Sequence, residues 1–231
     1  MPDSLVIHWP YLLLALILLC FPRQWLRTGK SILKKRRKPD GALERLAGIG
    51  ARDPEDRSVQ PAREFANFRN YVDLFRGVVG GYCLVQFSFS LGGDDSSPAP
   101  LLLESAVLLV AVLVQIIRFD TRLSFFAPIF FFLGLVTGTG GISAADAPVS
   151  IGHATGLFAF ALVLAINPVI PNPRMFLTAF GFLLLPFAFL FHGNLALLGI
   201  DALLIWLAPL LSLLTRRPVV IFARKAKSAS R

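Results

Sequence analysis

Residues 195–214 read LALLGIDALLIWLAPLLSLL and lead directly into Thr215, Arg216 and Arg217. The stretch matches the length of about 20 apolar residues that an α-helix needs to cross a bilayer. Asp201 is the one ionisable side chain within it. We therefore expect a membrane-spanning helix here, with a single carboxyl group inside the apolar run.

Similar apolar runs recur along the whole chain, at residues 5–21, 72–91, 101–117, 123–143, 151–170, 175–191 and 195–214. The mean hydropathy is +0.66, and only 16% of the residues are charged. Soluble domains carry about a quarter charged residues, so an ordinary soluble protein is excluded. The fold class that we expect is an all-α, polytopic membrane bundle with seven transmembrane helices.

The basic residues indicate how this bundle is oriented. When the connections between runs are assigned alternately to the two sides, all 23 Lys and Arg residues fall on one side. The other side carries Asp3, Asp94, Asp95 and Asp146 instead. By the positive-inside rule, the N-terminus should lie outside and the C-terminus in the cytoplasm.

Four regions follow from this pattern. We expect a first transmembrane helix in residues 1–22, a basic cytoplasmic loop in 23–71, a six-helix bundle in 72–215 and a basic tail in 216–231. The connections after residue 91 are short, which makes consecutive helices antiparallel neighbours. Within the loop, Phe65, Phe68, Val72 and Phe75 recur at helical spacing. Residues 62–75 should therefore form an interfacial amphipathic helix.

The bacterial inner membrane is the expected location. The chain contains no Asn-x-Ser/Thr acceptor for N-glycosylation. Its first apolar run is preceded by Asp3 and by no positive charge, unlike a removable signal peptide, and the basic cluster follows it. We expect this first helix to be retained.

A basic cluster in the loop consists of Lys34, Lys35, Arg36, Arg37 and Lys38. Near a membrane surface, each such charge contributes about 1 kcal/mol to the attraction of anionic lipid headgroups. The alternative is a topology signal that touches headgroups without specificity. Both interpretations place the partner in the bilayer, and neither requires nucleic acid. A membrane-protein partner is also compatible with the pattern.

Polar residues inside or beside the runs gather toward the outer face, and the candidates for a pocket there are Asp201, His153, Glu104, His192 and Asn194. Asp201 lies about 9 Å along its helix. Intramembrane ionisable groups usually face the bundle interior and find a partner. Thr137, Thr139 and Ser143 could line the same pocket, or their hydroxyls could serve only in helix packing. Alternatively, Glu104 and His153 reach water, and Asp201 merely bonds a neighbouring helix.

Small residues and prolines indicate where the helices pack and bend. Gly134 and Gly138 lie beside the bulky run 130–132, and small residues recur in 151–170. A face of small residues against an aromatic face is the expected packing. Pro128, Pro186 and Pro209 should kink their helices.

These patterns favour a non-enzymatic protein: a small-solute or ion permease, a ligand-binding subunit or a partner in a membrane complex, with an outward-facing polar pocket. The alternative is a membrane-embedded enzyme that uses Asp201, Glu104 and His153 as acid–base groups on a lipid-linked or periplasmic substrate. No catalytic motif is complete, so no catalytic residue is assigned. We expect no cofactor and no metal. Retinal is excluded because no Lys lies within any run.

Overall fold

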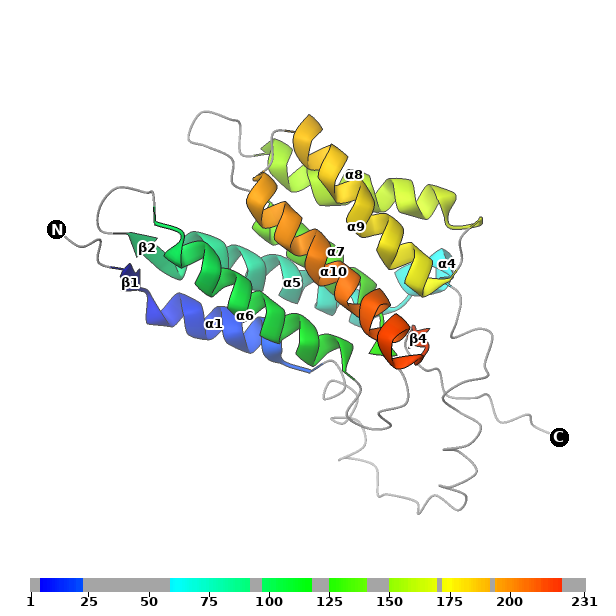
Figure 1. Ribbon diagram of the computed structural model, residues 1–231, viewed down its shortest axis with the longest axis horizontal. Coiled ribbons are helices and arrows are strands. Elements are labelled where there is room, and N and C mark those ends of the chain that lie inside the picture. The colour runs from blue at the N-terminus through cyan, green and yellow to red at the C-terminus, as the bar shows by residue number, and fades with distance from the viewer. Residues whose placement is uncertain are drawn as a thin grey trace, which may run out of the picture.

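The computed structural model describes residues 5–22, 59–91, 97–117, 125–140, 150–169, 172–191 and 194–221. In these ranges the chain is mostly helical, and its long helices run roughly along one axis (Figure 1). The helices are α1 (Trp9–Cys20), α4 (Pro61–Phe65), α5 (Phe68–Phe87), α6 (Ala99–Ile116), α7 (Ile129–Thr139), α8 (Ser150–Ile166), α9 (Pro173–Leu190) and α10 (Leu195–Thr215). The strands are β1 (Leu5–Ile7), β2 (Phe89–Leu91), β3 (Phe125–Phe126) and β4 (Val219–Val220).

Each predicted apolar run overlaps one of the helices α1 and α5 to α10. Among the described residues, three helices are long and apolar enough to cross a membrane: α6, α9 and α10. The apolar helices Trp9–Cys20, Ile129–Thr139 and Ala154–Ile166 are shorter. The prediction of a mostly helical chain that contains helices long and apolar enough to cross a membrane is confirmed. The number of spans and their orientation stay predictions.

Contacts between helices define their relative directions. Gly77 lies against the backbone of Phe131, and Gly81 lies against Thr139, so α5 and α7 run parallel. At one end of α7 and α10, Thr139 is hydrogen-bonded to Asp201, and at the other end β3 lies beside β4. Helices α7 and α10 are therefore antiparallel. Both relations agree with helices that alternate in direction along the chain.

Two small sheets connect the ends of helices. Strands β1 and β2 pair antiparallel, with Leu5 opposite Leu91, and join the start of α1 to the end of α5. Strands β3 and β4 pair parallel, with Phe125 opposite Val219, and join the start of α7 to the end of α10. These strands were not predicted, because two or three residues are too few to show an alternating pattern.

Helix α7 forms the centre of the described bundle. Phe130 packs edge-on against Phe160 of α8, with ring centroids 6.0 Å apart. Helices α5, α8 and α10 all contact α7. Nearly every residue of α7 is buried: Ile129, Phe130, Phe131, Phe132, Leu133, Gly134, Leu135, Val136, Gly138 and Thr139. A helix covered on all sides is hydrophobic all round, as this one is.

Glycines bring α5 and α7 into backbone contact. A Cβ atom at Gly134 would collide with the carbonyl oxygen of Leu74, and one at Gly138 with that of Val78. At Gly77 an added Cβ would lie 2.6 Å from the oxygen of Phe131. The glycines of α7 therefore lie against the backbone of Leu74, Val78 and Tyr82 of α5. Close backbone approach is what small residues permit between membrane helices.

The fourth run is shorter as a helix than predicted. Residues 123–143 were expected to be helical, whereas α7 begins at Ile129 and is preceded by β3. Pro128 occupies the N-cap position of α7 instead of kinking its interior. The first helical turn has N–H groups without helix partners, so proline is tolerated at such a start. Pro186 and Pro209 do lie inside α9 and α10.

The expected amphipathic helix over 62–75 is divided into α4 and the first turns of α5. Asn67 separates them, and its side-chain oxygen accepts a hydrogen bond from the backbone N–H of Arg69 at 3.2 Å. Asparagine is a favoured N-cap because it satisfies such an N–H group. The spacing of apolar residues continues across this break, which is why the sequence suggested one helix.

Candidate functional site

Asp201 lies on the buried face of α10, with 1% of its surface exposed. Helix α10 begins after Asn194, whose side-chain oxygen accepts hydrogen bonds from the N–H groups of Ala196 and Leu197 at 3.1 and 3.2 Å. This cap fixes where the helix starts and hence how deep Asp201 lies. Asn194, a predicted pocket residue, thus caps a helix at the same end.

Thr139 is the described partner of Asp201. It is the last residue of α7 and is fully buried, and its hydroxyl donates to Oδ2 of Asp201. The same hydroxyl lies 3.0 Å from the carbonyl oxygen of Leu135. A hydroxyl group has one proton and two acceptor sites. Thr139 can therefore donate to only one of these two oxygens at a time.

The second oxygen of Asp201, Oδ1, has no hydrogen-bond partner among the described residues. An ionised carboxylate accepts from Thr139 and leaves Oδ1 bare. A protonated carboxyl group donates to Oγ1 of Thr139, which then donates to Leu135. Both arrangements use the same positions of the heavy atoms. The pair can therefore bind or release a proton without moving a helix.

Glu104 is the other buried acid among the predicted pocket residues. It lies on α6 with 6% of its surface exposed. Its side chain makes no hydrogen bond to any other residue that the structure describes, Asp201 included. Helix α6 packs against α10, so both acids belong to neighbouring helices. The structure thus buries Glu104 without linking it to Asp201.

The histidine candidates are placed only in part. The backbone of His153 lies in the first turn of α8, while its side chain is outside the described residues. His192 and the basic cluster 34–38 are also outside them. Whether either histidine approaches Asp201 stays a prediction. In the described ranges, no three His, Cys, Asp or Glu side chains come together as a metal site requires.

A second buried polar cluster lies at the end of α1. The sequence suggests that Asp73 pairs with Arg69 or Arg76, and it pairs with Arg76 at 3.1 Å. Arg76 also donates from Nε to the carbonyl oxygen of Leu18 at 3.0 Å, and from Nη2 to that of Phe21. The last carbonyls of a helix have no helix partners. Arg76 satisfies two carbonyls at the end of α1.

Gln115 of α6 completes this cluster, and sequence reasoning missed it. Its Nε2 donates to the carbonyl oxygens of Leu19 and Phe21 at 2.8 and 2.9 Å. A single amide inside the apolar run 101–117 was the available signal. In a membrane helix, such a side chain usually bonds a neighbouring helix.

Comparison of the chain with protein-family models, curated proteins and solved structures finds no match. The chemistry of each buried cluster therefore indicates its role. At the end of α1, Arg76 and Asp73 have opposite charges, and Arg76 donates to three acceptors, which is typical of a structural tie. Asp201 has no basic partner among the described residues. The Oδ1 atom of Asp201, which has no hydrogen-bond partner among the described residues, is suited to bind a proton or a cation.

Proposed function

We propose that this chain is a multi-pass protein of the cell inner membrane that couples proton movement to the passage of a small solute or ion. In this proposal, seven transmembrane helices place the N-terminus outside and the C-terminus in the cytoplasm. Asp201 binds and releases the proton. The observation that carries the proposal is the buried carboxyl group bonded to Thr139, with Oδ1 unpaired among the described residues.

Two features support the proposed topology. The described helices alternate in direction where their contacts define it, as α5, α7 and α10 do. If all seven runs alternate in direction, all 23 Lys and Arg residues fall in the sequence segments assigned to one side. An excess of basic residues in short loops is the main determinant of orientation.

Impermeant thiol labelling of intact cells tests this topology. The variants are made in a background in which Cys20 and Cys83 are replaced by alanine. Cysteines introduced at Ser96 and Ala147 should react from outside, whereas one at Ser228 should react only after the membrane is opened. Labelling of position 228 from outside would overturn the orientation.

The position of Asp201 supports a proton-binding role. Ionisable residues within membrane helices are costly, and they commonly mark proton relays or ion pathways. A purely structural bond between helices needs one oxygen, and Thr139 already occupies Oδ2. An incoming proton would bind the carboxylate and would leave again from the same group, so no covalent bond to carbon changes.

A hydrophobic carbodiimide tests whether Asp201 is protonated in the membrane. This reagent modifies neutral carboxyl groups, and mass spectrometry identifies the modified residue. We expect Asp201 to react at neutral pH and to react less as the pH rises. Asp73 is the matched control, because its ion pair with Arg76 favours the ionised carboxylate, which the reagent does not modify. An unreactive Asp201 would contradict the proposal.

Flux measurements test the function itself. The full chain is reconstituted into liposomes that contain a pH-sensitive dye, and a potassium gradient with valinomycin drives proton entry. Candidate solutes are added in turn. Asp201→Asn should reduce proton entry to the rate of empty liposomes, whereas Asp201→Glu should retain part of it. Equal rates for Asp201→Asn and the unmodified protein would rule out Asp201 as the proton carrier.

A further inference from the structure

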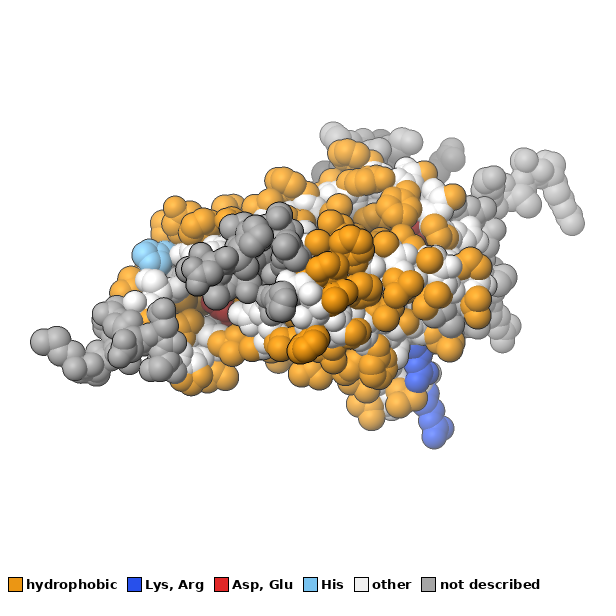
Figure 2. Space-filling model, turned by 90° about the horizontal axis from the view of Figure 1, so that it is seen from above, with side chains coloured by type: hydrophobic (Ala, Val, Ile, Leu, Met, Phe, Trp, Pro, Cys, Tyr) orange, Lys and Arg blue, Asp and Glu red, His pale blue; other side chains and the backbone are white. Residues whose placement is uncertain are grey.

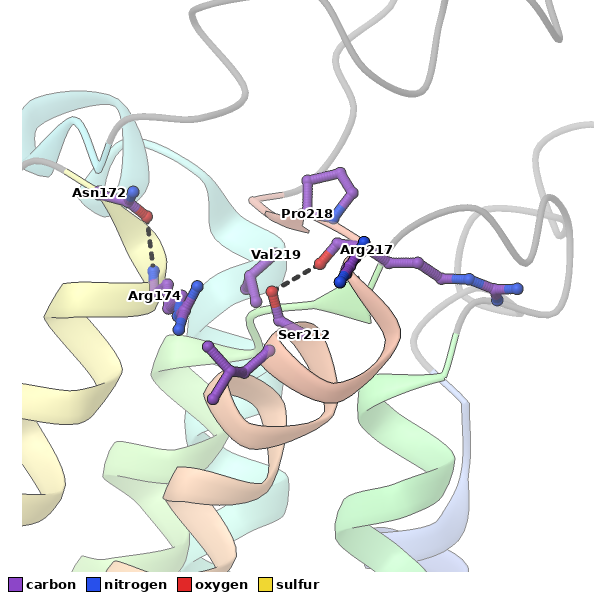
Figure 3. A pocket seen from close by; sticks show the side chains of 8 residues that line it. Asn172, Arg174, Ser212, Arg217, Pro218 and Val219 are labelled. Carbon is purple, nitrogen blue, oxygen red and sulfur yellow. Dashed lines mark hydrogen bonds between the residues drawn. The ribbon is translucent and has the colours of Figure 1, made fainter.

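A cleft of about 650 Å³ lies at the carboxyl end of α10 (Figure 3). Asp201 lies near the other end of that helix. It is formed by the start of α9, the end of α10 and strand β4. Arg174 lies across it from Ser212 and Val219 (Figure 3). The other polar residues that line it are Asn172, Arg216 and Arg217.

The cleft is strongly positive. Among the residues that the structure describes, three arginines and no acidic residue line it. Neither Arg174 nor Arg216 has an ion-pair partner among the residues that the structure describes. The start of α9 adds the positive end of a helix dipole, with Asn172 accepting a hydrogen bond from the N–H of Arg174 at 2.9 Å. These charges favour an anionic ligand.

Local hydrogen bonds shape the wall on the side of α10. Ser212 is 6% exposed, and its hydroxyl donates to the carbonyl oxygen of Arg217 at 2.5 Å. Arg216 has a left-handed backbone conformation with φ 55°, which ends the helix and reverses the chain toward β4. Strand β4 is then held by its pairing with β3. Arg216 and Arg217 therefore stand on an ordered turn.

We infer that this cleft is a binding site for a phosphate group, carried by either an anionic phospholipid headgroup or a soluble phosphorylated compound. Arginine suits this ligand because its planar guanidinium can donate two parallel hydrogen bonds to phosphate oxygens. The volume lies within the range of small-molecule sites. The cleft has no residue in common with the Asp201 site, so each can fail without the other.

The test uses the full chain in nanodiscs of phosphatidylcholine, into which phosphatidic acid is introduced in increasing amounts. Binding is measured by native mass spectrometry and by the rise in melting temperature. Replacing Arg174, Arg216 and Arg217 by glutamine should lower the affinity for phosphatidic acid about 100-fold, because each charge contributes about one kcal/mol.

Two controls separate a site from general charge attraction. The variant Arg45→Gln, Arg52→Gln, Arg57→Gln removes the same charge from the loop 23–71 and should bind as the unmodified protein does. Leu213→Trp narrows the cleft at an exposed lining position without removing charge, and should weaken binding. If the triple cleft variant fails to fold, Leu213→Trp still tests the site. Leu213 is 55% exposed, so its replacement should leave the fold intact.

Inorganic pyrophosphate distinguishes the two sources of phosphate. If it displaces phosphatidic acid from the unmodified protein, the site accepts soluble phosphate compounds. If it does not, while the cleft variants still lose lipid, the ligand is a phospholipid headgroup. Equal loss of binding in the cleft and loop variants, or unchanged binding in Leu213→Trp, would overturn the inference.

Discussion

The two buried polar clusters differ in how their charges are compensated. At the end of α1, Arg76 pairs with Asp73 and donates to two carbonyl oxygens, while Gln115 adds two further hydrogen bonds. At the start of α10, Asp201 has the single described partner Thr139 and an unpaired oxygen. The first cluster joins three helices, and the second joins two.

The difference separates a structural role from a chemical one. A charge that is removed from water is strongly disfavoured unless it is paired and hydrogen-bonded. The cluster around Arg76 meets that requirement, so losing one member should affect stability. Asp201 lacks a basic partner among the described residues and can avoid the cost of burial by taking up a proton. Losing its carboxyl group should affect function first.

Arg76→Met should produce the largest loss of stability. It leaves the Asp73 carboxylate buried without its cation, and breaking a buried pair costs about 3–5 kcal/mol. The free energy of unfolding is measured by titration with SDS. Arg69→Met, a half-buried arginine on the same helix, is the control and should change little. Equal losses for the two variants would contradict a special role for Arg76.

The contact between α5 and α7 connects the two clusters, and Gly138→Ala tests it. The added Cβ atom would collide with the carbonyl oxygen of Val78. Overpacking of this kind costs about 1–3 kcal/mol. Gly199→Ala is the matched control, because its added Cβ would meet, apart from its chain neighbours and the nearby backbone of its own helix, no atom of the described residues within 4 Å. The control should stabilise α10, since alanine favours a helix by about 1 kcal/mol over glycine.

Asp201→Asn and Thr139→Val should have the smallest effects on stability. A hydrogen bond between membrane helices contributes about 0.6 kcal/mol on average, so Thr139→Val should cost about that much. Asp201→Asn keeps the shape and can still bond Thr139. Both are measured by the same SDS titration. A loss as large as that of Arg76→Met would make Asp201 a structural residue and remove the contrast between the clusters.

Hydropathy was sufficient to locate the helices and the buried acid on α10. Long apolar runs have few alternatives in a membrane, because the backbone must satisfy its own hydrogen bonds there. Asp201 was found for the same reason, as a lone acid in such a run. Helical spacing left Arg69 and Arg76 as alternative partners of Asp73, and the structure pairs it with Arg76.

Hydrogen-bond partners on different helices could not be predicted from hydropathy or spacing. Gln115 bonds the end of α1 and Thr139 bonds Asp201 only because distant parts of the chain become neighbours. The arginine cleft also needs α9, α10 and β4 together. Many apolar side chains remain exposed around the bundle (Figure 2), as lipid-facing surfaces require. Apolarity alone therefore does not tell which face of a helix is inside.

The shortness of α7 has an electrostatic consequence. Its 11 residues extend about 16 Å, roughly half the thickness of a bilayer's hydrocarbon core. The carboxyl end of a helix carries about half a negative charge on its last carbonyl groups. Thr139 stands at that end, against Asp201. The partial negative charge at the end of α7 thus adds to the charge of the Asp201 carboxylate. Together these charges favour the binding of a proton or a cation, rather than an anion, beside Thr139.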